Sequence, residues 1–119
     1  MSSARVYQYP KCSTCRKALK WLELKGVDFE AVHIVEETPD AETLLNLMKK
    51  SGLPPKRFFN TSGKRYRELG LKDRVGTMSA EEAAEILAGD GMLIKRPLYV
   101  QGNTVLVGFR EAQWEELHV

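Results

Sequence analysis

The sequence predicts an α/β fold in three layers (α/β/α), with a mixed four-stranded sheet and an inserted helical subdomain. The first 35 residues have the pattern strand, helix, strand, which is typical of a βαβ unit. Residues 98–118 have the pattern of two short strands around a tight turn, followed by a helix. A mainly helical region lies between these two halves, so the four strands come from the two ends of the chain.

The opening βαβ unit is predicted from the spacing of its apolar residues. Residues 5–9 form a short apolar strand that ends at Pro10. The apolar residues of the next segment recur at helical spacing on one face: Cys15, Ala18, Leu19 and Leu22. Gly26 ends this helix, and residues 27–35 form a β-prone run. We expect the two strands to be parallel and joined by a right-handed crossover.

The helical insert is predicted from capping residues and from its apolar content. Asp40 begins a helix that ends at Gly52, and Ser79 with Glu82 begins a later one through a capping-box pattern. Residues 53–78 are too apolar for an open loop, so we expect short helices that pack as a small cap. The residues expected to pack there are Phe58, Phe59, Tyr66, Leu69 and Leu71.

The last part of the chain is predicted to form a hairpin and a helix. Gly102-Asn103 is a typical two-residue turn between strands 98–101 and 104–107. A final helix is predicted over residues 110–118, with Trp114 and Leu117 facing inward.

This element order predicts a thioredoxin-like architecture, because a βαβ half and a ββα half accompany a Cys-x-x-Cys motif at the start of the first helix. The chain has 119 residues, which is enough for one core. Hydrophobic residues make up 43% and charged residues 29%, a balance typical of globular proteins. We therefore predict a single domain over residues 1–119, with the helical insert at about 40–90.

Composition and charge exclude several classes of protein. The net charge is +2, from 18 basic and 16 acidic residues, which is too small an imbalance to indicate direct DNA binding. The apolar runs are far shorter than the ~20 residues that cross a bilayer, and no signal peptide is recognisable. We expect a cytoplasmic monomer without membrane contact. In the reducing cytosol, neighbouring cysteines are more often catalytic or metal-binding than structural.

The only two cysteines, Cys12 and Cys15, are the main candidates for chemistry. Cys12 precedes the first helical turn and faces solvent, whereas Cys15 lies on the apolar face. A helix N-terminus stabilises a thiolate, and it can lower the pKa of a thiol so placed from about 8.5 to roughly 3.5 to 7.5. We therefore predict that Cys12 attacks and Cys15 resolves, with a small anionic substrate or glutathione. The neighbouring residues expected to support the site are Lys11, Ser13, Thr14 and Arg16.

Two alternatives for the cysteines remain open. They could be inert core thiols, or they could form half of a zinc site with His33 and His118 as the other ligands. The two histidines show no short ligand spacing, so no metal is expected.

Four segments, taken in order, resemble the arsenate reductase-related family. They are residues 9–18 (YPKCSTCRKA), 58–63 (FFNTSG), 94–98 (IKRPL) and 106–109 (LVGF). The resemblance covers essentially the whole chain. The family includes glutaredoxin-dependent arsenate reductases and Spx-type transcription regulators, and it implies a thioredoxin-like core with an inserted helical subdomain.

The resemblance also implies site residues. The nucleophilic cysteine of the family falls on Cys12, and its oxyanion-binding arginine falls on Arg96, next to Pro97. The residues agree with this assignment, because a proline before a strand near the Cys-x-x-Cys loop is a candidate cis peptide. A guanidinium also offers two parallel N–H groups to an oxyanion. The predicted catalytic residues are thus Cys12, Cys15 and Arg96, with Pro97 in support.

Two functions follow from the resemblance. The first is a thiol-disulfide oxidoreductase similar to arsenate reductases, with no bound cofactor and with glutathione, thioredoxin or glutaredoxin as reductant. The second follows from Cys15, because a Cys-x-x-Cys pair is similar to the Spx-type regulators, in which the two cysteines form a regulatory disulfide. The inserted subdomain of those regulators contacts the RNA polymerase α-subunit, and a glycine of that contact falls on Gly52.

Overall fold

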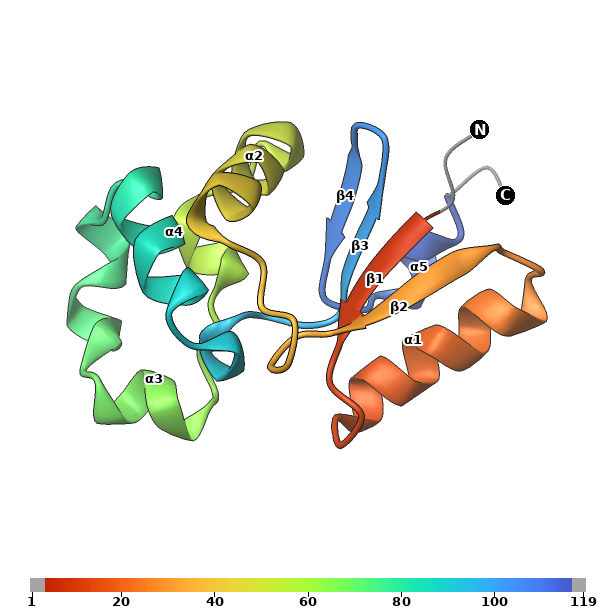
Figure 1. Cartoon of the computed structure of the whole chain (residues 1–119), viewed down its shortest axis with the longest axis horizontal. Coiled ribbons are helices and arrows are strands. Elements are labelled where there is room, and N and C mark those ends of the chain that lie inside the picture. The colour runs from red at the N-terminus through yellow and green to blue at the C-terminus, as the bar shows by residue number, and fades with distance from the viewer. Residues whose placement is uncertain (1–3, 117–119) are drawn as a thin grey trace. The chain divides into compact units, whose positions relative to one another are not determined.

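The computed structural model describes residues 4–116, which divide into two compact units (Figure 1). The sheet unit contains the described residues 4–33 and 96–116, and the helical unit contains residues 34–95. No helix within the described residues is both long enough and apolar enough to span a membrane. The helical unit is somewhat longer than the insert expected from the sequence, and a single domain over the whole chain stays a prediction.

The sheet unit contains four strands in the order β2-β1-β3-β4. β1 (Ala4–Gln8) is parallel to β2 (Phe29–His33) and antiparallel to β3 (Leu98–Gln101). β3 pairs with β4 (Thr104–Val107) in an antiparallel hairpin around Gly102, whose positive φ of 59° suits a glycine. The mixed four-stranded α/β sheet predicted from the sequence is therefore confirmed.

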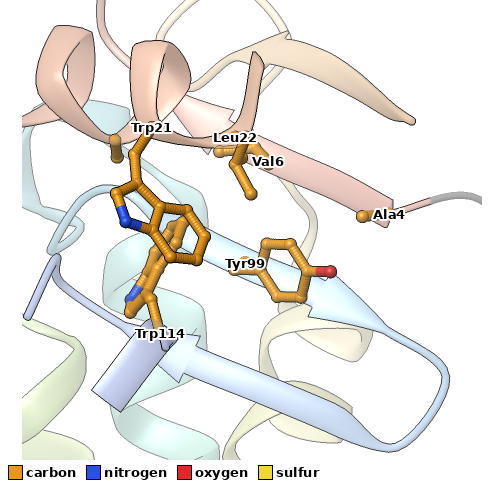
Figure 2. Packing of buried hydrophobic residues seen from close by; sticks show 7 residues of the cluster. Ala4, Val6, Trp21, Leu22, Tyr99 and Trp114 are labelled. Atoms are coloured by element: carbon orange, nitrogen blue, oxygen red, sulfur yellow. The ribbon is translucent and has the colours of Figure 1, made fainter. Parts of the chain in front are cut away.

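The core of the sheet unit lies between the sheet and its two helices, α1 (Ser13–Leu24) and α5 (Glu111–Trp114). Figure 2 shows Trp21 of α1 and Trp114 of α5 beside Tyr99 of β3. The Trp114 ring lies 5.3 Å from the Tyr99 ring and 6.0 Å from the Trp21 ring, centroid to centroid. Because residues of both helices share one buried cluster, both helices pack on the same face of the sheet.

The end of α1 agrees with the prediction, whereas the last helix is shorter than predicted. Gly26 has a positive φ of 72° directly after α1, as expected of a residue that ends a helix. Trp114 is fully buried, and its indole N–H donates to the Gly108 carbonyl at 3.2 Å. α5 begins one residue later than predicted and ends at Trp114, and Glu115 and Glu116 form a turn instead of continuing the helix. Residues 117 and 118 of the predicted helix lie outside the described residues.

The helical unit contains two longer helices, α2 (Ala41–Ser51) and α4 (Ala80–Ala88), which pack side by side (Figure 1). Both begin at the predicted caps, because Asp40 accepts a hydrogen bond from the Thr43 amide and Ser79 accepts one from the Glu82 amide. The shorter helices of this unit are η1 (Pro55–Phe58), α3 (Lys64–Glu68), η2 (Leu71–Asp73), η3 (Val75–Thr77) and η4 (Gly91–Leu93).

The expectation of short helices over residues 53–78 is confirmed, with one error in the packing. Phe58, Phe59, Tyr66 and Leu71 are buried as predicted. Leu69 is instead 42% exposed. It is the C-cap of the five-residue helix α3; Gly70 follows with a positive φ of 64° that turns the chain, and Leu71 fills the interior position after the turn.

Backbone pairing joins the middle of the helical unit to its C-terminal end. Phe59 and Ile94 form an isolated antiparallel bridge. The Asn60 amide donates to the Leu93 carbonyl at 2.7 Å, and the Lys95 amide donates to the Phe58 carbonyl at 2.8 Å. This pairing ends immediately before Arg96, at which the chain returns to the sheet unit.

Candidate functional site

The candidate site is built on the turn between β1 and α1. The Cys12 amide donates to the Tyr9 carbonyl at 3.0 Å, which closes the turn. Cys12 is the N-cap of α1, and its Sγ accepts a hydrogen bond from the Cys15 amide at 3.4 Å. A thiol thus takes the capping role usually filled by a serine or aspartate. The prediction that Cys12 directly precedes the first helical turn is confirmed.

The two thiols differ in burial and in acidity. Both are free cysteines; Cys12 is half-buried, and Cys15 is fully buried. Burial raises the pKa of Cys12, but hydrogen bonds from the Cys15 side chain and amide, the Arg96 charge and the Thr14 amide together bring this pKa below its ordinary value. Burial first, and then the neighbouring Cys12 sulfur, raise the pKa of Cys15 to about 12. Cys12 is therefore the more acidic of the two thiols.

Arg96 supplies positive charge to this turn from a distant part of the chain. Its charge lowers the pKa of both Cys12 and Cys15, although burial and the hydrogen bond between the two cysteines have larger effects on these pKa values. The Arg96-Pro97 peptide bond is cis, as the sequence suggested. The guanidinium carbon lies 5.1 Å from the centroid of the Tyr9 ring, a cation–π contact. The structure thus brings Arg96 together with both cysteines.

Tyr9 is a site residue that sequence reasoning missed. It was expected to belong to the first strand, but β1 ends at Gln8 and Tyr9 is only partly buried. Its ring forms a cation–π contact with Arg96 and meets the His33 ring edge-on at 5.7 Å between centroids. The available signal was an aromatic residue next to the Pro-Lys-Cys turn, at the end of a strand. That signal does not identify the partner of the ring, because Arg96 and His33 come from other segments.

The expected supporting residues lie around the turn in different environments. Lys11, Ser13 and Thr14 are exposed. Arg16 is also exposed, and its guanidinium donates to the Pro10 carbonyl at 3.1 Å, on the turn itself. Pro97 is buried next to Arg96. The backbone of Thr14 acts on Cys12, and the supporting roles of the other side chains stay predictions.

The zinc alternative gains no support from the geometry. Within residues 4–116, no group of three or more His, Cys, Asp or Glu side chains is arranged to hold a metal ion. His33 packs against Tyr9, and His118 lies outside the described residues.

Removing the Arg96 charge is expected to raise the pKa of Cys12. Arg96→Leu takes away a charge that favours the thiolate, whereas Arg96→Lys keeps a cation. The measurement is the ultraviolet absorbance of the thiolate against pH, in a Cys15→Ser background so that one thiol titrates. Lys17→Leu is the matched control, because it removes an exposed cation from α1. Titration curves that coincide for Arg96→Leu and its parent would contradict the assignment.

Comparison with known proteins extends these observations over the whole chain. The model of the ArsC family matches residues 7–117. The uncharacterised protein YusI of Bacillus subtilis (strain 168) is 56% identical over 114 residues, which are 96% of this chain and 97% of YusI. The global transcriptional regulator Spx of Lactiplantibacillus plantarum is 24% identical over 106 residues, which are 89% of this chain and 79% of Spx.

Comparison with solved structures shows the same family relationship. An ArsC family related protein from Bacteroides fragilis has a TM-score of 0.92 and 45% identity, with 97% of each chain covered. A possible arsenate reductase from Streptococcus mutans UA159 has a TM-score of 0.87 and 44% identity, with 97% of this chain and 99% of that chain covered. The thioredoxin-like α/β fold expected from the sequence is confirmed, and the chain belongs to the ArsC family.

Proposed function

We propose that this protein is a thiol-disulfide oxidoreductase in which Cys12 is the nucleophile and Cys15 the resolving thiol. The observation that carries the proposal is the unequal state of the two thiols at the start of α1. Cys12 caps the helix with a lowered pKa, and Cys15 is buried one turn later with a raised pKa. Because of this inequality, the more acidic Cys12 can attack first, and Cys15 stays protonated until the second step.

The reaction proceeds in two exchanges. The Cys12 thiolate attacks one sulfur of a disulfide or glutathionylated thiol, and the S–S bond breaks as the other sulfur leaves as a thiolate. Cys15 then loses its proton and attacks the Cys12 sulfur, which expels the bound thiol and forms the Cys12–Cys15 disulfide. Two electrons pass from the cysteine pair to the substrate.

The high pKa of Cys15 is compatible with this second step. After burial, a major reason for the raised pKa is the neighbouring Cys12 sulfur, which repels a second negative charge. Once Cys12 is joined to the substrate, it carries no charge, and this contribution disappears while the Arg96 charge remains. Cys15 is therefore easier to ionise when its attack is needed.

Arg96 makes an oxyanion a second possible substrate class. Its guanidinium is permanently charged and donates two parallel N–H groups to an oxyanion. With arsenate, Cys12 would displace hydroxide and form an S–As bond, and attack of Cys15 on sulfur would leave the bonding pair on arsenic, giving arsenite. The similarity to the possible arsenate reductase of Streptococcus mutans favours this class. Glutathione, thioredoxin or glutaredoxin then reduces the disulfide, and the sulfur pair itself carries the electrons without a resident cofactor.

Alkylation by iodoacetamide as a function of pH tests the proposed roles. In Cys15→Ser, the labelling rate of Cys12 is expected to rise at a pH below about 8.5, the ordinary thiol pKa. In Cys12→Ser, the buried Cys15 is expected to resist labelling until the solution is strongly alkaline. Equal, alkaline titration of both thiols would refute the proposal. The same lowered pKa stabilises the folded, reduced protein above the pKa of the unfolded thiol, and this contribution is lost as the pH falls through the pKa of the folded state.

A redox-sensing transcription regulator is the second candidate function. The similarity to Spx over 89% of this chain favours it, and the partner would be the RNA polymerase α-subunit. Gly52 is compatible with this role, but its positive φ of 69° at the end of α2 is also sufficient reason for a glycine there. A pull-down with the α C-terminal domain, comparing oxidised and reduced protein, tests this candidate. Binding that is absent in both redox states would remove it.

A further inference from the structure

A cavity of about 500 Å³ lies within the helical unit and is lined in part by α3. This volume falls within the range of about 300–1,000 Å³ that is usual for small-molecule sites. The residues that line it come from η1, α3, η2 and the turns between them: Lys56, Thr61, Tyr66, Arg67, Gly70 and Lys72. None of them belongs to the candidate redox site.

The charged side chains on the wall of this cavity are all cationic. Lys56, Arg67 and Lys72 line it, and no carboxylate is among the six lining residues. Within residues 4–116, none of the three cations forms an ion pair; Arg67 donates to the Ser62 carbonyl at 3.0 Å, a contact that leaves its charge uncompensated. Positive charge in a concave site raises the local concentration of anions.

Three cations of the same unit that do not line the cavity are engaged with carboxylates: Arg65 with Glu68 at 2.8 Å and Asp90 at 2.9 Å, Arg74 with Glu82 at 3.2 Å, and Lys64 with Glu68 at 3.9 Å. Glu68, Glu82 and Asp90 thus pair with cations outside the cavity. The charge inside the cavity is left for a ligand.

Neutral donors complete the cavity. The Tyr66 ring is buried and packs against Phe59, with 6.1 Å between the ring centroids, so it is held in place. The hydroxyls of Tyr66 and Thr61 have no hydrogen-bond partner among the described residues. A phosphate group can accept hydrogen bonds from all of these groups, which are two lysines, an arginine and two hydroxyls. The guanidinium can in addition bind two phosphate oxygens at once.

We propose that this cavity binds a small phosphate-bearing molecule with at least two negative charges. The net charge of +2 for the whole chain does not indicate an anionic ligand, because the excess of cations is local. Residues 56–74 contain seven basic and two acidic residues: Lys56, Arg57, Lys64, Arg65, Arg67, Lys72 and Arg74 against Glu68 and Asp73.

The experiment is a titration of the full chain, labelled with ¹⁵N, with pyrophosphate and separately with ADP, at low ionic strength. Amide signals of Thr61, Gly70 and their neighbours are expected to shift with saturable dependence on ligand. Calorimetry gives the Kd, which is expected to rise with salt. Tighter binding of ADP than of pyrophosphate would show that the cavity recognises a nucleotide. Equal binding of the two would show that it recognises the phosphate groups alone. Both outcomes support the proposed site.

Two double variants that remove the same charge distinguish binding in the cavity from unspecific electrostatic attraction of the anion to the protein. Lys56→Gln with Lys72→Gln is expected to weaken pyrophosphate binding by about tenfold. Lys49→Gln with Lys64→Gln removes the same charge from exposed positions of the same unit and is expected to change Kd by less than about twofold. Unchanged amide spectra away from the substitutions show that each variant is folded.

Three outcomes would overturn the proposal: no amide shift at the cavity, equal weakening by both double variants, or shifts confined to residues 9–16 and Arg96. The last outcome would place the anion at the candidate redox site. The alkylation of Cys12 does not depend on this titration, so failure of the cavity and failure of the proposed redox function are distinguishable.

Discussion

Replacement of Cys12 by serine is expected to reduce thiol-disulfide exchange by about a thousandfold or more, to the rate of the uncatalysed reaction. The reason is that Cys15 cannot take over, because it is fully buried, and burial is the largest cause of its raised pKa and persists in this variant. The measurement is the reduction of a glutathionylated peptide, with glutathione or a thioredoxin system as reductant.

Cys15→Ser is the informative partner of this variant. It leaves the first attack possible but removes the resolving thiol, so a mixed disulfide between Cys12 and the substrate is expected to accumulate and to be visible by mass spectrometry. Thr14→Val is the matched control, because this exposed side chain lies between the cysteines and only its backbone acts on Cys12. Activity near the parent rate in Cys12→Ser, or no adduct in Cys15→Ser, would contradict the assigned roles.

Trp114→Ala is expected to lower the free energy of unfolding by about 3–5 kcal/mol, the usual range for a buried aromatic residue. Trp114 is fully buried, packs against Trp21, Tyr99 and Phe109, and donates a hydrogen bond to the Gly108 carbonyl. Removing its side chain leaves a cavity in the cluster shown in Figure 2 and an unpaired carbonyl at Gly108. Urea unfolding followed by circular dichroism measures the loss.

Two variants keep this test interpretable. Trp114→Phe retains much of the ring volume and is expected to cost less than Trp114→Ala, which allows a measurement even if the alanine variant does not fold. Gln113→Ala changes an exposed neighbour on the same short helix and is expected to change stability by less than about 0.5 kcal/mol. An alanine variant that loses less than about 1 kcal/mol would mean that Trp114 does not anchor the core.

Features that depend on neighbouring residues were predicted well. The caps at Asp40 and Ser79 and the hairpin turn at Gly102 are local motifs, in which a side chain or a positive φ satisfies backbone geometry within a few residues. The different positions of Cys12 and Cys15 follow in the same way from their phase on one helix.

Features that depend on contacts between distant segments were predicted less well. Leu69 was expected to pack inward, but hydrophobicity alone does not show where the short helix α3 ends or which residue fills the interior after it. The role of Tyr9 was missed, because its partners Arg96 and His33 are far away in the sequence. The cationic cavity was missed for a similar reason, since overall charge does not reveal which cations pair with carboxylates.

The sequence by itself determined the order of the elements, the mixed sheet and the unequal placement of the two cysteines, because periodicity and capping act over a few residues. Only the tertiary structure decided the electrostatic environment of those cysteines. The pKa of a thiol depends on its burial and on charges within a few ångströms, and the charge of Arg96 reaches Cys12 only when the chain returns to the sheet. The same reason holds for the cavity of the helical unit, in which folding gathers cations and leaves them without carboxylate partners.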